Sequence, residues 1–217
     1  MLRILGFARL GFAVVGLTAI VSLLIHNASA TADYNYLNFF SFFTVDANIL
    51  AALVLLVAGA AALRGNQSRE LSGLRGAVTT YMAITGIVYN LLLADLTENL
   101  QTNVQWANVI VHILMPIVLV VDFLIDRTVH RLGLRNALWW LVFPLVWTAY
   151  TLIRGAIVDW YPYPFLDHRL HSIGFVALYV VGIAVAFFVV STALAYSTRV
   201  LNRSEPKPVA PQRATAV

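Results

Sequence analysis

Residues 171–198 have the sequence HSIGFVALYVVGIAVAFFVVSTALAYST, which contains no aspartate, glutamate, lysine or arginine. A helix needs about 20 mainly apolar residues to cross the hydrocarbon core of a bilayer, at about 1.5 Å of rise per residue. This run is therefore long enough to form a transmembrane helix. Earlier in the chain, further apolar runs lie at about 4–25, 37–63, 75–94, 105–125 and 138–158. The sequence therefore predicts an all-α, polytopic membrane protein with six transmembrane helices.

The composition agrees with this fold class. Hydrophobic residues make up 60% of the 217 residues and charged residues only 11%, a balance too apolar for a soluble domain of this length. Spans and short loops use nearly the whole chain, so we expect residues 1–203 to form a single transmembrane domain. The remaining stretch 204–217, SEPKPVAPQRATAV, is rich in proline and predicts a disordered tail. The absence of cysteine excludes disulfides, thiolate nucleophiles and cysteine-ligated metals.

Positive charge is concentrated in alternate loops. Twelve of the fourteen arginine and lysine residues lie at the first end, in the loops after the second and fourth spans, and after the sixth span: Arg3, Arg9, Arg64, Arg69, Arg75, Arg127, Arg131, Arg135, Arg199, Arg203, Lys207 and Arg213. Because positive residues are enriched in cytoplasmic loops, we expect both termini and the tail to be cytoplasmic. The net charge of +4 is therefore a topology signal and does not indicate nucleic-acid binding. The loops on the other side hold these charges: Asp33, Asp95, Glu98, Arg154, Asp159, Asp167 and Arg169.

The first apolar run has a second interpretation. Arg3 and Arg9, the apolar stretch and the small residues 28–30 together resemble a signal peptide with its cleavage site. The stretch is about 22 residues long, however, whereas the apolar core of a signal peptide usually has about 7–15. We therefore expect the first helix to be retained; cleavage would leave five spans.

Ionisable residues inside predicted spans are candidates for function, because burying them in a membrane is costly. Asp46, His112 and Asp122 are the clearest examples. Thr44 and His112 each lie about seven residues into a span that starts at the outer face, at a depth of roughly 10 Å. We therefore expect these two residues to lie in one layer. Asp46 is about 200° around the helix from Thr44 and is expected to face elsewhere.

Other polar residues share helix faces with this candidate pair. Ser41, Thr44 and Asn48 have the i, i+3, i+7 spacing of one face. Asn108 and His112 are related by i, i+4, and a proline one turn later is expected to open the backbone hydrogen bonding. The third span carries a stripe whose small members predict close helix contact: Thr79, Ala83, Gly86 and Asn90.

Each of these residues also has a structural explanation. Serine, threonine and asparagine in spans usually bond to a neighbouring helix or to the carbonyl four residues earlier. Asp122 lies close to the inner boundary beside Asp126 and Arg127, which favours an ion pair there. Arg154 and Arg169 lie near the outer boundary, where snorkelling or loop structure is the usual explanation. We interpret the following aromatic residues as an interfacial belt: Trp106, Trp160, Tyr161 and Tyr163.

Three stretches carry a resemblance to a known family: FFSFFTVDANIL (39–50), HILMPIVLVVDFLID (112–126) and YPYPFLD (161–167). In these the chain resembles the bacterial six-helix relatives of the androgen-induced transmembrane hydrolases, the family that includes the androgen-dependent TFPI-regulating protein. The resemblance implies that Thr44 and His112 form a catalytic pair that hydrolyses fatty acid esters of hydroxy fatty acids. It also implies an integral membrane protein of the bacterial inner membrane.

The residues themselves are compatible with ester hydrolysis. A neutral imidazole can accept the proton of an attacking hydroxyl group. A developing oxyanion needs hydrogen-bond donors, for which Ser41, Asn48, Asn90 and tyrosine hydroxyls are the candidates. Arg154 or Arg169 is expected to meet the carboxylate of a lipid-like ligand at the outer boundary. The sequence contains no GxSxG, HExxH or glycine-rich phosphate motif, which are the more familiar routes to hydrolysis.

Two rival classes stay open. In a small-solute or lipid transporter or channel, Asp46, Asn48 and His112 line a polar path, although no internal repeat supports this reading. If the protein is a hydrolase, we expect it to need no cofactor and no metal. Its expected partners are a lipid-like ligand and membrane lipids, and not nucleic acid. The oligomeric state is left open. A haem or metal protein is the second rival, and its candidate ligands are His26, His112, His168 and His171.

Overall fold

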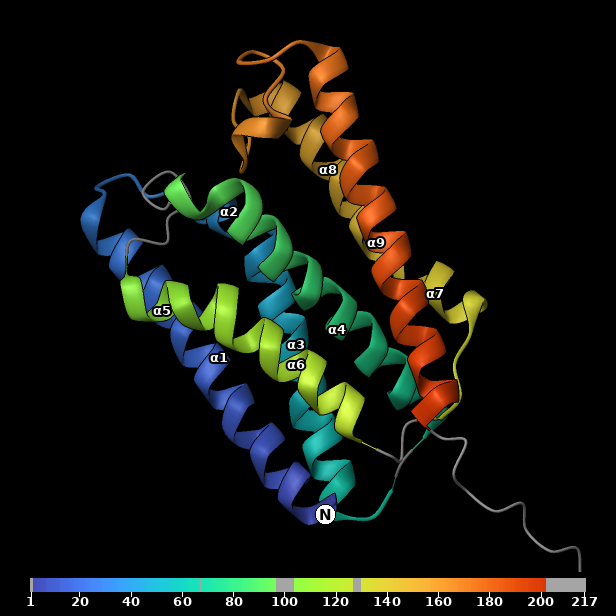
Figure 1. The fold of residues 1–217 in the computed structure, drawn as a ribbon. Helices are drawn as coiled ribbons and strands as arrows, with labels where there is room; N and C mark the ends of the chain where they lie inside the picture. The colour runs from blue at the N-terminus through green and yellow to red at the C-terminus, as the bar shows by residue number, and fades with distance from the viewer. Residues whose placement is uncertain (1, 67, 97–103, 127–129, 202–217) are drawn as a thin grey trace, which may run out of the picture.

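The computed structural model describes residues 2–66, 68–96, 104–126 and 130–201 (Figure 1). Within these ranges the regular elements are helices and no strand occurs. The expected all-α chain with six helices that are long and apolar enough to cross a membrane is confirmed: Leu2–Ala30, Phe43–Leu63, Arg69–Leu93, Gln105–Ile125, Leu134–Val158 and Ile173–Val200. The predicted tail, Glu98 and Arg127 lie outside the described residues.

Several spans change helix type along their length. The main elements are α1 (Leu2–Ala30), α3 (Phe43–Leu63), α4 (Arg69–Val88), α5 (Gln105–Val109), α6 (Met115–Ile125), α7 (Leu134–Trp140), α8 (Val142–Val158) and α9 (Ile173–Leu201). Two π-helical segments, η1 (Tyr89–Leu93) and η3 (Ile110–Leu114), extend α4 and join α5 to α6. Three short elements lie in the connections: α2 (Tyr36–Phe39), η2 (Ala94–Leu96) and η4 (Pro164–Leu166).

Two prolines account for interruptions in the fourth and fifth spans. Proline lacks an N–H group, and its ring clashes with the carbonyl four residues earlier. Pro144 therefore cannot donate a hydrogen bond to the carbonyl of Trp140, and the helix is interrupted between α7 and α8. Pro116 likewise leaves the carbonyl of His112 without its helical partner, and η3 precedes it. The expected opening of the backbone pattern beside His112 agrees with this π-helical segment.

The second span differs from its prediction. We expected one helix over 37–63, with Thr44 about seven residues inside it. Instead, the side chain of Asn35 caps the separate helix α2 by accepting hydrogen bonds of 3.0 and 3.3 Å from its amides. The chain then leaves the helical conformation before α3 begins at Phe43. Thr44 therefore lies in the first turn of α3, and its expected position deep within one helix was wrong.

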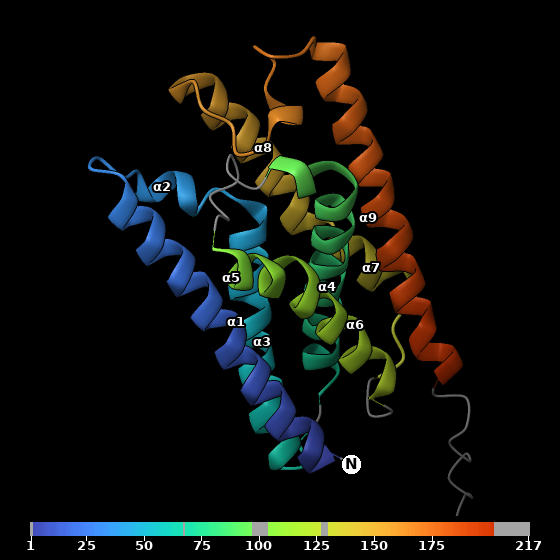
Figure 2. The ribbon, with the colours of Figure 1, turned by 60° about the vertical axis from the view of Figure 1, so that its left-hand side comes forward.

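Helix α4 is the centre of the bundle. It packs against α3, α6 and α9, while α1 packs along α3. Of the most apolar 18-residue stretch in each span, 61% is buried for Arg69–Leu93 but only 17% for Leu134–Val158. Figures 1 and 2 both show α7, α8 and α9 on one side of the other helices. The N-terminus and the last turn of α9 lie at one end of the bundle, here called the Arg9 end; the opposite end, with the loop between α8 and α9, is the Tyr163 end.

Small residues allow close helix contacts. A Cβ atom on Gly59 of α3 would lie 2.9 Å from the backbone oxygen of Gly6 on α1, so a larger residue would force these helices apart. A Cβ atom on Gly86 of α4 would lie 3.0 Å from Cβ of Pro116 on α6. The close contact expected of the third span is therefore confirmed at Gly86, whereas Asn90 on the same stripe is exposed.

Four charged side chains form a buried cluster at the Arg9 end. The guanidinium of Arg9 lies 2.8 Å from Asp122 and 2.5 Å from Asp126. Arg75 makes matching ion pairs of 2.8 and 2.6 Å with the same carboxylates. The cluster joins α1 and α4 to the end of α6. The expected ion pair of Asp122 is confirmed, but its partners are Arg9 and Arg75, which are far from it in the sequence.

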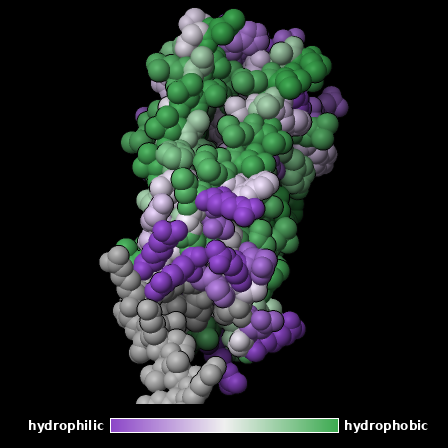
Figure 3. Space-filling model, turned by 90° about the vertical axis from the view of Figure 1, so that its right-hand side faces the viewer, coloured by the Kyte–Doolittle hydropathy of each residue, from purple (hydrophilic) through white to green (hydrophobic). Residues whose placement is uncertain are grey.

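The outside of the bundle is covered by large apolar side chains. Figure 3 shows a mainly hydrophobic face along α9, with hydrophilic side chains gathered toward the end where this helix finishes. Such contiguous apolar surface is unusual on a soluble monomer and is typical of helices in contact with lipid. Prominent exposed examples are Phe7, Val14, Ile153, Ile157, Leu178, Val181 and Val185.

Candidate functional site: an apolar cavity beside Thr44

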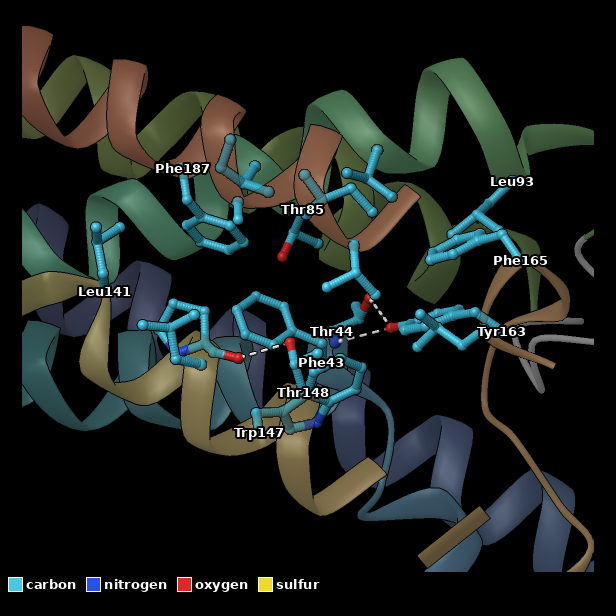
Figure 4. A pocket seen from close by; sticks show the side chains of 18 residues that line it. Phe43, Thr44, Thr85, Leu93, Leu141, Trp147, Thr148, Tyr163, Phe165 and Phe187 are labelled. Atoms are coloured by element: carbon cyan, nitrogen blue, oxygen red, sulfur yellow. Dashed lines mark hydrogen bonds between the residues drawn. The ribbon is translucent and has the colours of Figure 1, made fainter. Parts of the chain in front are cut away.

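A cavity is lined by residues of α3 and α4 on one side and of α8 and α9 on the other (Figure 4). It holds about 830 Å³ of empty space, counting the part that opens to the outside. The walls of small-molecule sites are typically apolar for the most part, with a few polar groups. The cavity therefore has the character of a site for an apolar ligand. The lining residues with polar side-chain atoms are Thr44, Thr85, Trp147, Thr148 and Tyr163.

Thr44 is placed in the cavity wall beside Tyr163. The amide of Thr44 donates to the Tyr163 hydroxyl at 3.4 Å, and the two hydroxyl oxygens lie 3.5 Å apart. Burial raises the pKa of Tyr163 from 10.0 to about 12, so its hydroxyl stays protonated at neutral pH. We expected Tyr163 in an interfacial belt, and this was wrong. Its side chain is only 6% exposed, because the loop around η4 folds back over the start of α3 and packs Tyr163 against Phe42 and Phe165.

His112 lies outside the cavity lining, within η3. Its Nδ1 lies 2.6 Å from Oδ1 of Asn108, and Nδ2 of Asn108 donates to the Tyr89 hydroxyl at 2.7 Å. The Tyr89 ring completes this group by stacking on the imidazole, with ring centroids 3.9 Å apart. Because an amide oxygen only accepts, Nδ1 of His112 is the protonated nitrogen and Nε2 carries the free lone pair. An imidazole held in this way can accept a proton at Nε2.

Asn48 links the surroundings of Thr44 and His112. Its Nδ2 donates to the carbonyl of Thr44 at 2.9 Å and to the carbonyl of Val111, the neighbour of His112, at 3.2 Å. The start of α3 and the π-helix η3 therefore lie side by side, in agreement with the expected shared layer. No hydrogen bond joins the two side chains, however. The Thr44 hydroxyl pairs with Tyr163, and the His112 Nδ1 pairs with Asn108.

The expected oxyanion donors lie outside the cavity lining. Ser41, Asn48 and Asn90 each bond to the carbonyl four residues earlier, at 2.6, 2.9 and 2.8 Å. The remaining amide hydrogen of Asn48 is directed to Val111, so both of its donors are used. These are the local bonds that the sequence offered as the structural alternative. The cavity geometry gives no support to an oxyanion role for these three side chains.

The two arginines at the Tyr163 end have different partners. Arg169 pairs with Asp167 at 2.7 Å, and its guanidinium lowers the pKa of that carboxyl from its usual range. Arg154 donates to the neutral amide oxygen of Asn38 at 2.7 Å and lies over the ring of Trp160. No carboxylate among the described residues lies within ion-pair distance of Arg154. Its positive charge is therefore the more available of the two for an anionic ligand.

The residues named for the rival functions do not converge on the cavity. Asp46, Asn48 and His112, expected to line a transport path, are absent from its lining. His168 bonds to a tyrosine hydroxyl and His171 stacks on a phenylalanine ring. Across the described parts of the chain, no group of three or more histidine, aspartate or glutamate side chains is arranged to hold a metal ion.

Sequence reasoning missed several residues of this region. Thr85 and Thr148 line the cavity from α4 and α8, and Tyr89 stacks on His112. Each follows the periodicity of an ordinary buried helix position, so no local signal separated it from the core. Pro162 and Pro164 around Tyr163 did carry a signal, because two prolines so close together predict an irregular loop in place of a continuing helix.

Comparisons with protein-family models, with curated proteins and with solved structures find no match for this chain. The resemblance seen in the three sequence stretches therefore stays a prediction.

Proposed function

We propose that this chain is an integral membrane protein that binds a lipid-like molecule in the cavity and hydrolyses an ester bond of that molecule at Thr44. The six long apolar helices and their apolar exterior support membrane insertion. The positive residues at the Arg9 end support a cytoplasmic location of that end. The packing of α1 along α3, with Arg9 in the buried ion cluster, supports retention of the first helix.

The cavity is the observation that carries this proposal. It lies between helices at the edge of the bundle, its wall is mainly apolar, and the Thr44 hydroxyl is part of that wall. The apolar part of this wall suits contact with an acyl chain. The hydrogen bond from Thr44 to Tyr163 is long, at 3.5 Å, so the Thr44 hydroxyl can turn toward a ligand at little cost.

The proposed reaction follows the chemistry of a nucleophile and a base. The Thr44 oxygen attacks the ester carbonyl carbon and loses its proton to Nε2 of His112. The bond between the carbonyl carbon and the alcohol oxygen then breaks, and the leaving alcohol takes the proton from His112. Water hydrolyses the acyl-threonine, releasing the fatty acid and restoring the Thr44 hydroxyl. Asn108 holds the imidazole in the tautomer that this sequence of steps needs.

Proton transfer from Thr44 to His112 requires a contact between their side chains, and no hydrogen bond joins them directly. Hydrogen bonds between catalytic groups are often long or misaligned before the substrate binds. Asn48 bonds to the carbonyls of Thr44 and Val111 and so keeps the backbone segments of the two residues side by side. We propose that ligand binding, or a bridging water, completes the connection. A carboxylate on the ligand would meet Arg154 at the Tyr163 end.

The test is hydrolysis of a panel of long-chain esters by the purified protein in lipid nanodiscs. Thr44→Ala and His112→Ala should each remove most of the activity, and the double variant should be scarcely worse, because members of one catalytic unit are not additive. Thr44→Ser should retain substantial activity, since it keeps the hydroxyl, whereas Thr44→Val should be inactive. Thr80→Ala is the matched control, because Thr80 is also buried but donates to the carbonyl of Gly76 at 2.9 Å, away from the cavity.

Two outcomes distinguish the proposed binding of a lipid from the proposed hydrolysis at Thr44. Full activity of a well-folded Thr44→Ala variant would end the nucleophile assignment. Binding of labelled esters without any turnover would leave a lipid-binding or lipid-transporting protein, and uptake of the same esters into proteoliposomes would then identify the transporter.

A further inference from the structure

The cavity wall contains a hydroxyl group that has no partner. Thr85 on α4 is only 4% exposed, and its Oγ1 has no hydrogen-bond partner among the described residues. Figure 4 shows this oxygen directed into the cavity, on the side facing α8. The other threonine hydroxyls of the wall are engaged, since Thr148 donates to the carbonyl of Pro144 at 2.8 Å and Thr44 pairs with Tyr163.

Thr151 and Thr192 also have buried hydroxyls without a partner among the described residues, but of these three threonines only Thr85 lines the cavity. A threonine in a helix normally donates to the carbonyl four residues earlier. Thr80, five residues earlier on the same helix, does this with Gly76 at 2.9 Å. Thr85 does not, although a buried donor without an acceptor is unfavourable. The hydroxyl therefore has an unused capacity to donate at the cavity wall.

A threonine hydroxyl can donate one hydrogen bond and accept others. The free donor of Thr85 therefore favours an occupant that carries acceptor atoms, which a plain hydrocarbon lacks.

We propose that the cavity is specific for an oxygenated lipid, and that the Thr85 hydroxyl donates a hydrogen bond to a carbonyl or ester oxygen within its chain. This inference rests on the proposed binding of a lipid-like ligand in the cavity. It adds that the ligand has an acceptor in its buried part, level with Thr85, and apolar segments on either side. Where that oxygen is the carbonyl attacked by Thr44, Thr85 also becomes a donor to the developing oxyanion, the role first expected of Ser41, Asn48 and Asn90.

The test compares two ligands of equal chain length, 9-heptadecanone and heptadecane, both radiolabelled, by equilibrium binding to the purified full-length protein. The ketone carries its carbonyl at mid-chain and contains no ester bond that the protein could hydrolyse. Thr85→Val replaces the hydroxyl by a methyl group of similar size. It should weaken binding of the ketone about five- to tenfold, the value of one hydrogen bond, and leave heptadecane binding unchanged. Thr85→Ser should restore ketone binding to within about twofold of the unmutated protein.

A stability measurement provides an independent readout. In the ligand-free protein, Thr85→Val should raise the melting temperature, because it removes a buried donor that lacks an acceptor. The matched change Thr80→Val removes a donor that is already satisfied and should leave ketone binding unchanged while lowering or preserving the melting temperature.

The results distinguish the inference from the function on which it rests. If Thr85→Val weakens the binding of both ligands equally, Thr85 contributes packing and not a hydrogen bond. If it changes the binding of neither, Thr85 does not contact the ligand. Either result overturns the inference while leaving ligand binding in the cavity in place. An absence of saturable binding of either ligand to the unmutated protein overturns the proposed function together with the inference.

Discussion

The hydroxyl of Tyr163 lies 3.4 Å from the amide nitrogen of Thr44, although 119 residues separate them in the chain. The first amides of a helix have no partner within the helix, and Phe42, the residue before α3, provides no side-chain cap. Tyr163 fills this place from the opposite side of the bundle. The same contact positions the Thr44 hydroxyl in the cavity wall and closes that wall at the Tyr163 end.

Removal of the Tyr163 hydroxyl tests this cap, because the stability that the cap provides should depend on pH. Tyr163→Phe should lower the stability at neutral pH by about 1 kcal/mol, since it leaves a buried amide without a partner. The pKa of Tyr163 is about 12 in the folded protein and 10.0 in an ordinary environment. Because folding favours the protonated hydroxyl, its contribution to the free energy of unfolding is complete below pH 10 and is lost as the pH rises to 12. Melting curves should therefore show the difference between the two proteins shrinking over this range. A constant difference would contradict the buried, protonated state of Tyr163.

The buried ion cluster predicts a large effect of one arginine and a small effect of another. Arg9→Gln leaves the carboxylates of Asp122 and Asp126 with half of their positive partners and should destabilise the protein by about 3–5 kcal/mol. Arg64 is exposed at the end of α3, so Arg64→Gln should cost less than about 1 kcal/mol. Unfolding in mixed micelles measures both. Equal losses would show that the cluster contributes nothing beyond an exposed charge.

The contact between α1 and α3 predicts opposite effects of two glycine substitutions. Gly59→Ala places a Cβ atom 2.9 Å from the backbone oxygen of Gly6 and should destabilise the protein by about 1–3 kcal/mol. Gly182→Ala on α9 meets no atom within 4 Å and should leave the melting temperature unchanged or slightly raised, because alanine favours the helix. A tolerated Gly59→Ala would mean that α1 is free to move away from α3.

The group around His112 predicts that Asn108 positions the imidazole for catalysis. Asn108→Leu removes the acceptor of Nδ1 and should lower kcat for ester hydrolysis about 100-fold or more, with little change in KM. Asn108→Asp keeps an acceptor oxygen and should lose less. Tyr89→Phe keeps the stacked ring and removes only the hydroxyl bonded to Asn108, so its effect should be smaller still. A rise in KM with an unchanged kcat would indicate a role in binding alone.

Single cysteines test the orientation of the chain, which has none of its own. Asp33→Cys lies in the loop after α1 and Asn66→Cys in the loop between α3 and α4, and both positions are exposed. With a cytoplasmic Arg9 end, a membrane-impermeant thiol reagent should label position 33 in intact cells and position 66 only after permeabilisation. Labelling of position 66 in intact cells would reverse the proposed topology.

The sequence by itself determined the features that depend on neighbouring residues. Apolar runs of sufficient length predicted the six long helices, because burial of backbone groups in lipid leaves helix formation as the solution within each run. The bonds of Ser41, Asn48 and Asn90 to carbonyls four residues earlier are local in the same way. The change of helix type before Pro116 follows from the missing N–H group of that residue.

Only the tertiary structure decided which distant groups meet. The sequence placed Asp122 at a boundary, but the choice of Arg9 and Arg75 as its partners depends on the order in which α1, α4 and α6 pack. By its residue type and position Tyr163 was expected in the interfacial belt, but the path of its loop places its hydroxyl beside Thr44. The cavity itself arises from the way α8, α9 and the loop around η4 pack against α3 and α4. Helical periodicity shows which residues share a face, but the packing of the helices decides what that face meets.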